Sequence, residues 1–358
     1  MEQILRRAGD VLGTGLTDPV DLGGSSRSVV LRCRTAAGGS VIVKAFKGGD
    51  EAVRHFASEA AGLSLGLGGP ELLAVDPIVP LLVMADLGGA PTLADVLLGD
   101  DPKAAEEGLS AWARGLGRLG AGSVHRRAEF DRLVAGSTPG VPPAEPWIRR
   151  TTTELPGQLE RAGIGAPTEL AGELARIGTA GGEEFPAFTP GDTCPDNNLL
   201  TPDGLRLIDF EAACYQSVFL TAAYCRMPFS TCWCVFRLPP GRAQAIEEAY
   251  RSEIVAAYPA LAEDAVWQAG MQQAIAAWTV YTTVWLVPRT TENKPLHPTR
   301  RPSPTARQVL RHRWEMARGL TDFPALAETA GLLLRQTAGE WDDEPLPGYP
   351  AFAGGRAS

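Results

Sequence analysis

The chain has 358 residues, enough to bury a hydrophobic core in one large two-lobed unit or in two smaller domains. Hydrophobic residues make up 44% of it and charged residues 21%, which is ordinary globular usage and argues against a disordered chain. The formal net charge of -9 argues against a nucleic-acid partner, because phosphate contacts need clustered lysine and arginine.

No segment has the pattern of a signal peptide or of a membrane span. Arg6 and Arg7 stand near the N-terminus, but no apolar run follows them, and no stretch of about eighteen uncharged apolar residues occurs anywhere. We therefore expect a cytoplasmic protein without a membrane partner. In that compartment the six cysteines are expected to be thiols.

Two hydrophobic segments near the N-terminus predict an antiparallel sheet. Residues 28–34 and 40–46 are rich in β-branched side chains, and the segment 35–39 between them is typical of a hairpin loop. Beyond Gly49, apolar residues recur at helical spacing up to about residue 65, which predicts a helix with Asp50 as its N-cap. We expect this helix to pack on the sheet.

Two further apolar runs, residues 71–75 and 80–85, extend the sheet. The second run ends in Asp86-Leu87-Gly88-Gly89, where we place the boundary between a small lobe of residues 1–87 and a large lobe of residues 88–358. The periodicity of the large lobe is mostly helical. Its expected helices cover about residues 104–119, 153–161, 169–177, 242–258, 263–285, 305–318 and 324–336.

Three oxygen-bearing side chains in the large lobe give the clearest chemical signal. Asp192 and Asn197 stand five positions apart, and Asp209 follows twelve positions later. The segment Thr201-Pro202-Asp203-Gly204 predicts a turn between two short strands, which would return Asp209 beside Asn197. This spacing resembles the catalytic loop and metal-binding segment of kinases. Phosphoryl transfer needs a carboxylate near the acceptor hydroxyl and oxygen ligands for Mg²⁺. We therefore expect Asp192 to be catalytic and Asn197 and Asp209 to bind magnesium.

Other interpretations of this segment stay open. Aspartate and asparagine favour loops and helix caps, so each of the three residues, taken alone, is consistent with a surface loop or a helix cap. Asn198 is a competing metal ligand by its identity, one position beyond the expected spacing. Glu211 is a further candidate to assist the metal or an acceptor amine.

Lys44 lies in the second predicted strand, where a lysine is usually a solvated edge residue. Glu59 follows in the predicted helix at helical spacing from Phe56 and Leu63, which places its carboxylate within reach of Lys44. Glu51 is the rival partner, although an acid in the first turn is favoured by the helix dipole alone. The strand that carries Lys44 resembles the third strand of kinases, and this resemblance implies that Lys44, paired with Glu59, holds the phosphates of ATP.

In this order the residues resemble the aminoglycoside phosphotransferase family and related kinase-like enzymes, over about residues 15–225. The resemblance implies an α+β, two-lobed protein-kinase-like fold, with an antiparallel-sheet N-lobe that binds ATP and a mostly helical C-lobe that binds the acceptor. It also implies an ATP- and Mg²⁺-dependent phosphotransferase. The expected partner is a small-molecule acceptor with a hydroxyl group, such as an aminoglycoside-like compound, a sugar or an amino alcohol.

The resemblance further implies two groups of nucleotide contacts. Ser25 and Ser26 lie in a turn rich in small residues, which lets backbone N–H groups approach phosphate oxygens. Ala85 and Leu87 stand where the family pairs the backbone of its hinge with the adenine edge. One departure is Pro190, at the position where the family usually has a histidine that braces the metal-binding segment.

The remaining unusual residues are read as parts of the core. A zinc hypothesis is raised by the density of thiols at Cys194, Cys214, Cys225, Cys232 and Cys234. Because C-x-C is not the usual C-x-x-C spacing and no histidine lies nearby, we expect these thiols to be small buried hydrophobes. Core positions are likewise expected for the aromatic residues Trp267, Trp278 and Trp285.

Two other functions remain as alternatives. A protein kinase is disfavoured, because no Ala-Pro-Glu sequence follows Asp209-Phe210-Glu211. A nucleotide-binding protein without turnover is favoured by Pro190. It is also favoured by the segment 22–28, which lacks the G-x-G-x-x-G pattern of a kinase phosphate-binding loop. The complete set of Asp192, Asn197 and Asp209 argues against it.

Overall fold

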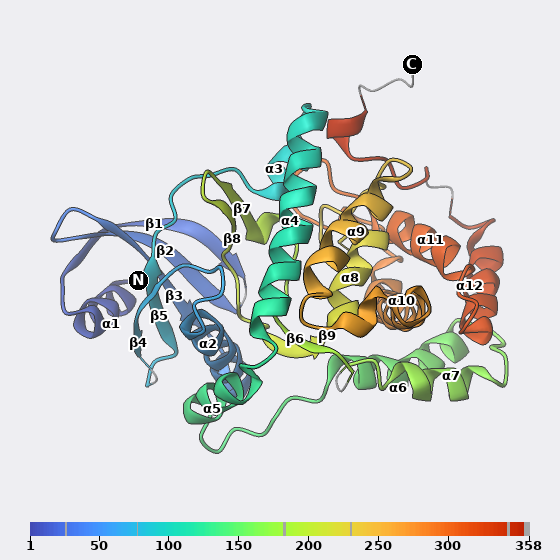
Figure 1. Cartoon of the computed structure of the whole chain (residues 1–358), viewed down its shortest axis with the longest axis horizontal. Helices are drawn as coiled ribbons and strands as arrows, with labels where there is room; N and C mark the ends of the chain where they lie inside the picture. The colour runs from blue at the N-terminus through green and yellow to red at the C-terminus, as the bar shows by residue number, and fades with distance from the viewer. Residues whose placement is uncertain (26, 77, 182–183, 230, 342–343, 354–358) are drawn as a thin grey trace.

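A computed structural model describes residues 1–353 apart from residues 26, 77, 182–183, 230 and 342–343. An antiparallel sheet forms one end of the molecule, and a larger, mostly helical part follows it (Figure 1). The predicted two-lobed α+β architecture is therefore confirmed. None of the helices within the described residues is both long and apolar enough to cross a membrane.

The sheet of the small lobe contains five strands. In their order across the sheet these are β1 (Leu16–Ser25), β2 (Ser28–Thr35), β3 (Ser40–Phe46), β5 (Leu81–Ala85) and β4 (Leu72–Asp76). Strands β2 and β3 form the predicted antiparallel hairpin. On β3, Val43 and Ala45 face a small core shared with α1 (Glu2–Leu12), so the alternation of a strand turns Lys44 to the opposite face.

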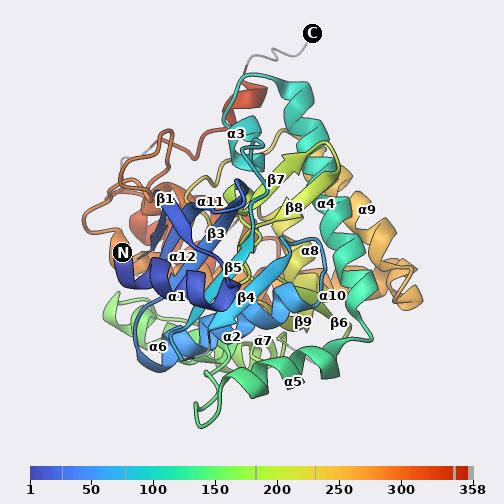
Figure 2. The same cartoon turned by 90° about the vertical axis from the view of Figure 1, so that its left-hand side faces the viewer.

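Helix α2 (Gly49–Ser64) is the helix predicted after the hairpin, and it contacts β3 and β4 (Figure 2). Its N-cap is Gly48, so the expected cap at Asp50 is wrong. Gly48 and Gly49 adopt positive φ angles of 98° and 33°, and the helix therefore begins before Asp50. Asp50 lies in the first turn, where its charge is favoured by the helix dipole.

The large lobe is built around α4, which packs along α9 (Figure 1). Its helices are α3 (Leu93–Leu97), α4 (Pro102–Ser123), α5 (Arg127–Ser137), α6 (Trp147–Arg161), α7 (Leu170–Ile177), α8 (Val218–Arg226), α9 (Arg242–Ile254), α10 (Asp264–Leu286), α11 (Ala306–Ala317) and α12 (Pro324–Thr337). Trp267 and Trp278 are buried in its core, as expected. The sequence did not predict α5 or α8. Almost every residue of α8 is buried, so it lacks an amphipathic pattern.

Two small two-stranded sheets complete the fold. Strands β7 (Asn198–Thr201) and β8 (Gly204–Leu207) form the predicted hairpin around Pro202-Asp203. Strand β6 (Pro186–Thr189) pairs with β9 (Cys214–Ser217), which brings the two ends of the motif-bearing segment together. Asp209, which lies between β6 and β9, contacts Lys44 on the five-stranded sheet, with 2.9 Å between Oδ1 and Nζ.

Candidate active site

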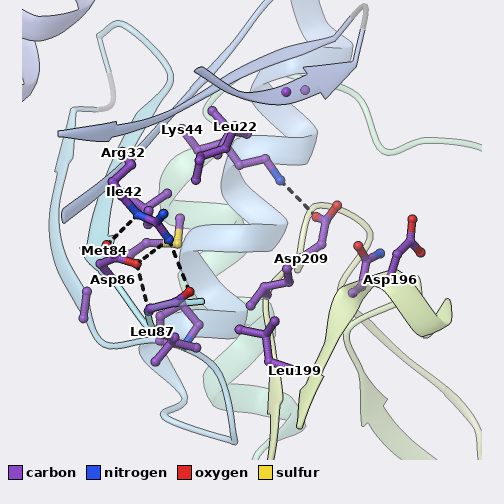
Figure 3. A pocket seen from close by; sticks show the side chains of 18 of the residues that line it. Leu22, Arg32, Ile42, Lys44, Met84, Asp86, Leu87, Asp196, Leu199 and Asp209 are labelled. Atoms are coloured by element: carbon purple, nitrogen blue, oxygen red, sulfur yellow. Dashed lines mark hydrogen bonds and ion pairs between the residues drawn. The ribbon is translucent and has the colours of Figure 1, made fainter. Parts of the chain in front are cut away.

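A cavity of about 310 Å³ lies between the sheet and the segment that follows β6 (Figure 3). A second cavity of about 320 Å³ adjoins it, because the two share Gly24, Lys44, Asn197 and Asp209 among their lining residues. The first is lined mainly by the sheet and the connection after β5. The second is lined by the catalytic-loop candidates, including Asp192, and by residues 231–233.

Lys44 lines both cavities. Its Nζ lies 2.6 Å from Glu59 Oε2, 2.9 Å from Asp209 Oδ1 and 3.4 Å from Glu211 Oε2. Glu59 is fully buried in α2, and Lys44 is 5% exposed. The ion pair expected between Lys44 and Glu59 is thus present in the structure. Glu51, the rival partner, instead lies 3.4 Å from His55.

Three carboxylates surround this one ammonium group, and the imbalance of charge shifts its titration. Burial opposes the charge on Lys44, but Glu59, Asp209 and Glu211 outweigh burial and raise the pKa of Lys44. Burial also raises the pKa of Glu59, to about 8, even though Lys44 opposes the shift. The raised pKa of Lys44 thus reflects the three carboxylates around it, whereas the raised pKa of Glu59 reflects mainly its burial.

Close packing at two glycines fixes the backbone segments that carry Asp192 and Asp209. Gly191 has a φ of 85°, and a Cβ atom there would lie 2.1 Å from the carbonyl oxygen of Ala212. Phe210, which is fully buried beside Asp209, packs so closely on α2 that a Cβ on Gly62 would lie 3.0 Å from its ring. The segments around Asp192 and Asp209 are therefore locked to each other and to α2.

The structure distinguishes Asn197 from Asn198. Asn197 lies in a short 3-10 helix, Pro195–Asn197, and lines both cavities together with Asp209. Asn198 is fully buried, and its Nδ2 donates to the carbonyl oxygens of Thr193 and Cys194. Asn198 therefore braces the loop, whereas Asn197 is the asparagine that faces the cavity.

Asp192 lines the second cavity at the start of this loop. Its Oδ1 accepts a hydrogen bond from the backbone N–H of Cys194 at 2.9 Å. Burial raises the pKa of Asp192 to about 6 although the hydrogen bond opposes this shift, and the nearby charge of Asp209 adds to it. A carboxylate with such a pKa is suited to accept a proton near neutral pH.

The turn between β1 and β2 covers the cavity. Gly23 and Gly24 line it, and a Cβ on Gly24 would lie 2.5 Å from the carbonyl oxygen of Ser28. Ser25 is the last residue of β1, and its backbone pairs with Ser28; Ser26 lies outside the described residues. Arg27 extends from this turn to Glu211, with 2.6 Å between Nη2 and Oε1.

The connection after β5 forms the other end of the cavity. Ala85 and Leu87 both line it, but the backbone N–H of Ala85 already donates to the carbonyl oxygen of Glu71 at 2.9 Å. The N–H of Ala85 is therefore already paired within the protein. Asp86 accepts two hydrogen bonds from Arg32, at 2.7 and 3.0 Å, which hold the connection against β2 (Figure 3).

Sequence patterns did not predict the cavity residues contributed by two distant loops. Arg300 lines the first cavity, lies 3.8 Å from Asp196, and stacks with its guanidinium 5.1 Å from the centre of the Trp233 ring. The indole Nε1 of Trp233 donates to Asp196 Oδ2 at 2.7 Å. The one signal available beforehand was Asp196, an extra carboxylate beside Asn197.

Comparisons with known proteins bear on the fold. No protein-family model and no curated protein sequence matches the chain. The choline kinase of Cryptosporidium parvum Iowa II superposes with a TM-score of 0.52 and 12% identity, covering 88% of this chain and 93% of that one. The aminoglycoside phosphotransferase APH(2")-IIia, solved with GDP and kanamycin, gives a TM-score of 0.50 and 14% identity, covering 95% and 98%.

Proposed function

From the kinase-like fold that the chain shares with these small-molecule phosphotransferases, we propose that it is an ATP- and Mg²⁺-dependent phosphotransferase acting on a hydroxyl group of a small molecule. The observation that carries the proposal is the convergence of Lys44, Asp192, Asn197 and Asp209 on one double cavity. A buried ammonium, a carboxylate with a raised pKa and two oxygen ligands are the groups that phosphoryl transfer requires.

The nucleotide would occupy the first cavity, between an ATP-binding lobe of residues 1–87 and an acceptor-binding lobe of residues 88–358. Its adenine would meet the carbonyl of Ala85 and the backbone of Leu87. The phosphates would then extend toward Lys44, beneath the end of β1, where the backbone of Ser25 is the proposed phosphate contact. Lys44 would hold the phosphates while Glu59 fixes its ammonium group.

The residues present fit a magnesium ion. Mg²⁺ prefers oxygen ligands, and Asn197 and Asp209 offer an amide oxygen and a carboxylate that line the same cavity. The excess of carboxylates around Lys44 supports a divalent cation there, since ligand atoms of Glu59, Asp209 and Glu211 lie within 4.8 Å of one another. When bound, the ion would neutralise charge on the triphosphate.

Asp192 would act on the acceptor, whose hydroxyl would enter the second cavity. Its carboxylate would orient the hydroxyl and accept its proton, which makes the oxygen a better nucleophile. Arg300 lines the first cavity and Arg27 lines the second, and both would add positive charge near the transferred group.

A panel of hydroxyl-bearing metabolites and antibiotics, screened for acceptor-dependent ADP release, tests this function. One acceptor that stimulates ADP release and gains a phosphate by mass would support it. Tight ATP binding without transfer to any member would favour the second candidate, a nucleotide-binding protein without turnover. The observation that favours this second candidate is Pro190, which is buried at the position of the expected histidine brace.

A further inference from the structure

Three thiols meet beside the catalytic-loop candidate, although they are far apart in the sequence. Cys194 lies two residues after Asp192, and Cys232 and Cys234 lie in the segment that follows α8. All three are buried, with 4%, 2% and 0% of their surfaces exposed. The sulfur atoms of Cys232 and Cys234 are 3.1 Å apart.

A carboxylate completes this thiol cluster. One ligand atom each of Cys194, Asp196 and Cys232 lies within 4.8 Å of the other two, and Cys232 Sγ is 3.8 Å from Asp196 Oδ1. A tetrahedral zinc ion with Zn–S bonds of about 2.3 Å separates its ligand atoms by roughly 3.8 Å. The 3.8 Å between Cys232 Sγ and Asp196 Oδ1 matches this separation, and the three ligand atoms lie close enough together to share one ion.

We propose that Cys194, Cys232 and Asp196 bind a thiolate-preferring divalent cation of the zinc class, with Cys234 as the next ligand within reach. This site goes beyond the proposed phosphotransferase function and does not depend on it. The cation would join the catalytic loop to residues 231–234 at the wall of the second cavity.

Contacts around the ligands support their orientation for metal binding. Trp233 Nε1 donates to Asp196 Oδ2 at 2.7 Å, which leaves Oδ1 as the oxygen turned to Cys232. Trp233 in turn packs against the guanidinium of Arg300 and against the ring of His297. The centres of the Trp233 and His297 rings are 5.2 Å apart. Metal ligands are typically fixed by such outer contacts, and losing one weakens metal affinity.

The site is chemically distinct from the proposed magnesium site. Thiolates select zinc-class ions, whereas Mg²⁺ prefers oxygen ligands, so magnesium is not expected to displace the cation. The sequence argued against zinc because its local C-x-C lacks the usual spacing. In the structure the other two ligands are Asp196 and Cys194, which lie 36 and 38 positions before Cys232. A local sequence pattern cannot detect ligands so far apart.

Titration of the reduced, metal-free protein with Co²⁺ tests the site, because thiolate-bound cobalt gives sulfur-to-metal absorption bands. Wild type should show these bands, and zinc but not magnesium should abolish them. Cys232→Ser should lose them, and Trp233→Phe should need roughly tenfold more cobalt. Cys225→Ser, in buried α8, is the matched control and should keep them. Absent bands, or bands unchanged in Cys232→Ser, would overturn the proposal.

A second measurement on the wild-type protein covers the case in which Cys232→Ser does not fold. Zinc should slow alkylation of Cys194 and Cys232 at least about tenfold, with each site followed by mass spectrometry. Cys214 lies outside the cluster and is partly exposed, so its alkylation should not change. Equal slowing at all three cysteines, or none at Cys194 and Cys232, would overturn the proposal.

Discussion

The Nζ atom of Lys44 lies 2.6 Å from Oε2 of Glu59, and this ion pair is buried between β3 and α2. A buried pair of this kind is costly to break from one side only, since the remaining charge loses its partner. The pair therefore couples the stability of the small lobe to the group that we propose holds the phosphates.

The first prediction separates these two roles of Lys44. Lys44→Ala should lower turnover at least about a hundredfold and destabilise the fold by about 3 kcal/mol, because Glu59 is left buried and unpaired. Glu59→Gln alone should have a milder effect on both. The double variant should regain stability but not turnover. Chemical denaturation measures the stability and steady-state kinetics measure the turnover. Wild-type turnover in Lys44→Ala would contradict the phosphate-binding role proposed for Lys44.

The second prediction concerns magnesium. ATP should bind at least about tenfold more weakly in EDTA than with Mg²⁺, because the triphosphate would add negative charge beside three carboxylates. Asp209→Asn should reduce this difference by removing a proposed ligand. Calorimetric titrations in both conditions measure it. Equal ATP affinity with and without Mg²⁺ would argue against the roles given to Asn197 and Asp209.

The third prediction is a pH profile. Because Asp192 has a pKa of about 6 and must be ionised to accept a proton, kcat/KM should be level above about pH 7. Below about pH 6 it should fall roughly tenfold per pH unit. Rates measured between pH 5 and 8.5 at constant ionic strength, with ATP affinity determined at each pH, provide the test. A flat profile would show that no group of this pKa limits the reaction.

The fourth prediction is structural. Gly191→Ala should destabilise the protein by about 2 kcal/mol or more, since the residue has a left-handed backbone and its Cβ would meet Ala212 O. Gly122→Ala is the matched control, because this exposed glycine of α4 has open space around its Cβ position. That change should be neutral or stabilising by up to about 1 kcal/mol. Equal unfolding midpoints for the two variants would contradict the proposed packing.

Sequence reasoning succeeded where chemistry and local geometry coincide. The β2–β3 and β7–β8 hairpins are short-range structures with clear turn residues, so the strands carrying Lys44 and preceding Asp209 could be predicted. The phase of α2 follows from its apolar spacing, which correctly turned Glu59 inward. The prediction of Asp50 as the N-cap was wrong because Gly48 and Gly49 adopt positive φ angles, and the helix begins before Asp50.

Other parts of the site depend on contacts that no local pattern encodes. Arg300 lies more than a hundred residues after Asp196, and only the folded chain brings it into the cavity. Helix α8 is buried on nearly every side, which removes the periodicity that identifies surface helices. The meeting of Cys194 with Cys232 likewise requires the β6–β9 pairing and the turn of the chain after α8.

The most direct test of the account compares phosphate transfer and ATP binding in Asp192→Asn. The change keeps the shape of the side chain but removes the carboxylate that we propose accepts the hydroxyl proton. Transfer to an identified acceptor should fall at least about a hundredfold, roughly 2.7 kcal/mol of barrier, while ATP affinity stays within about twofold of wild type. Transfer at the wild-type rate by the Asp192→Asn enzyme would contradict the mechanism.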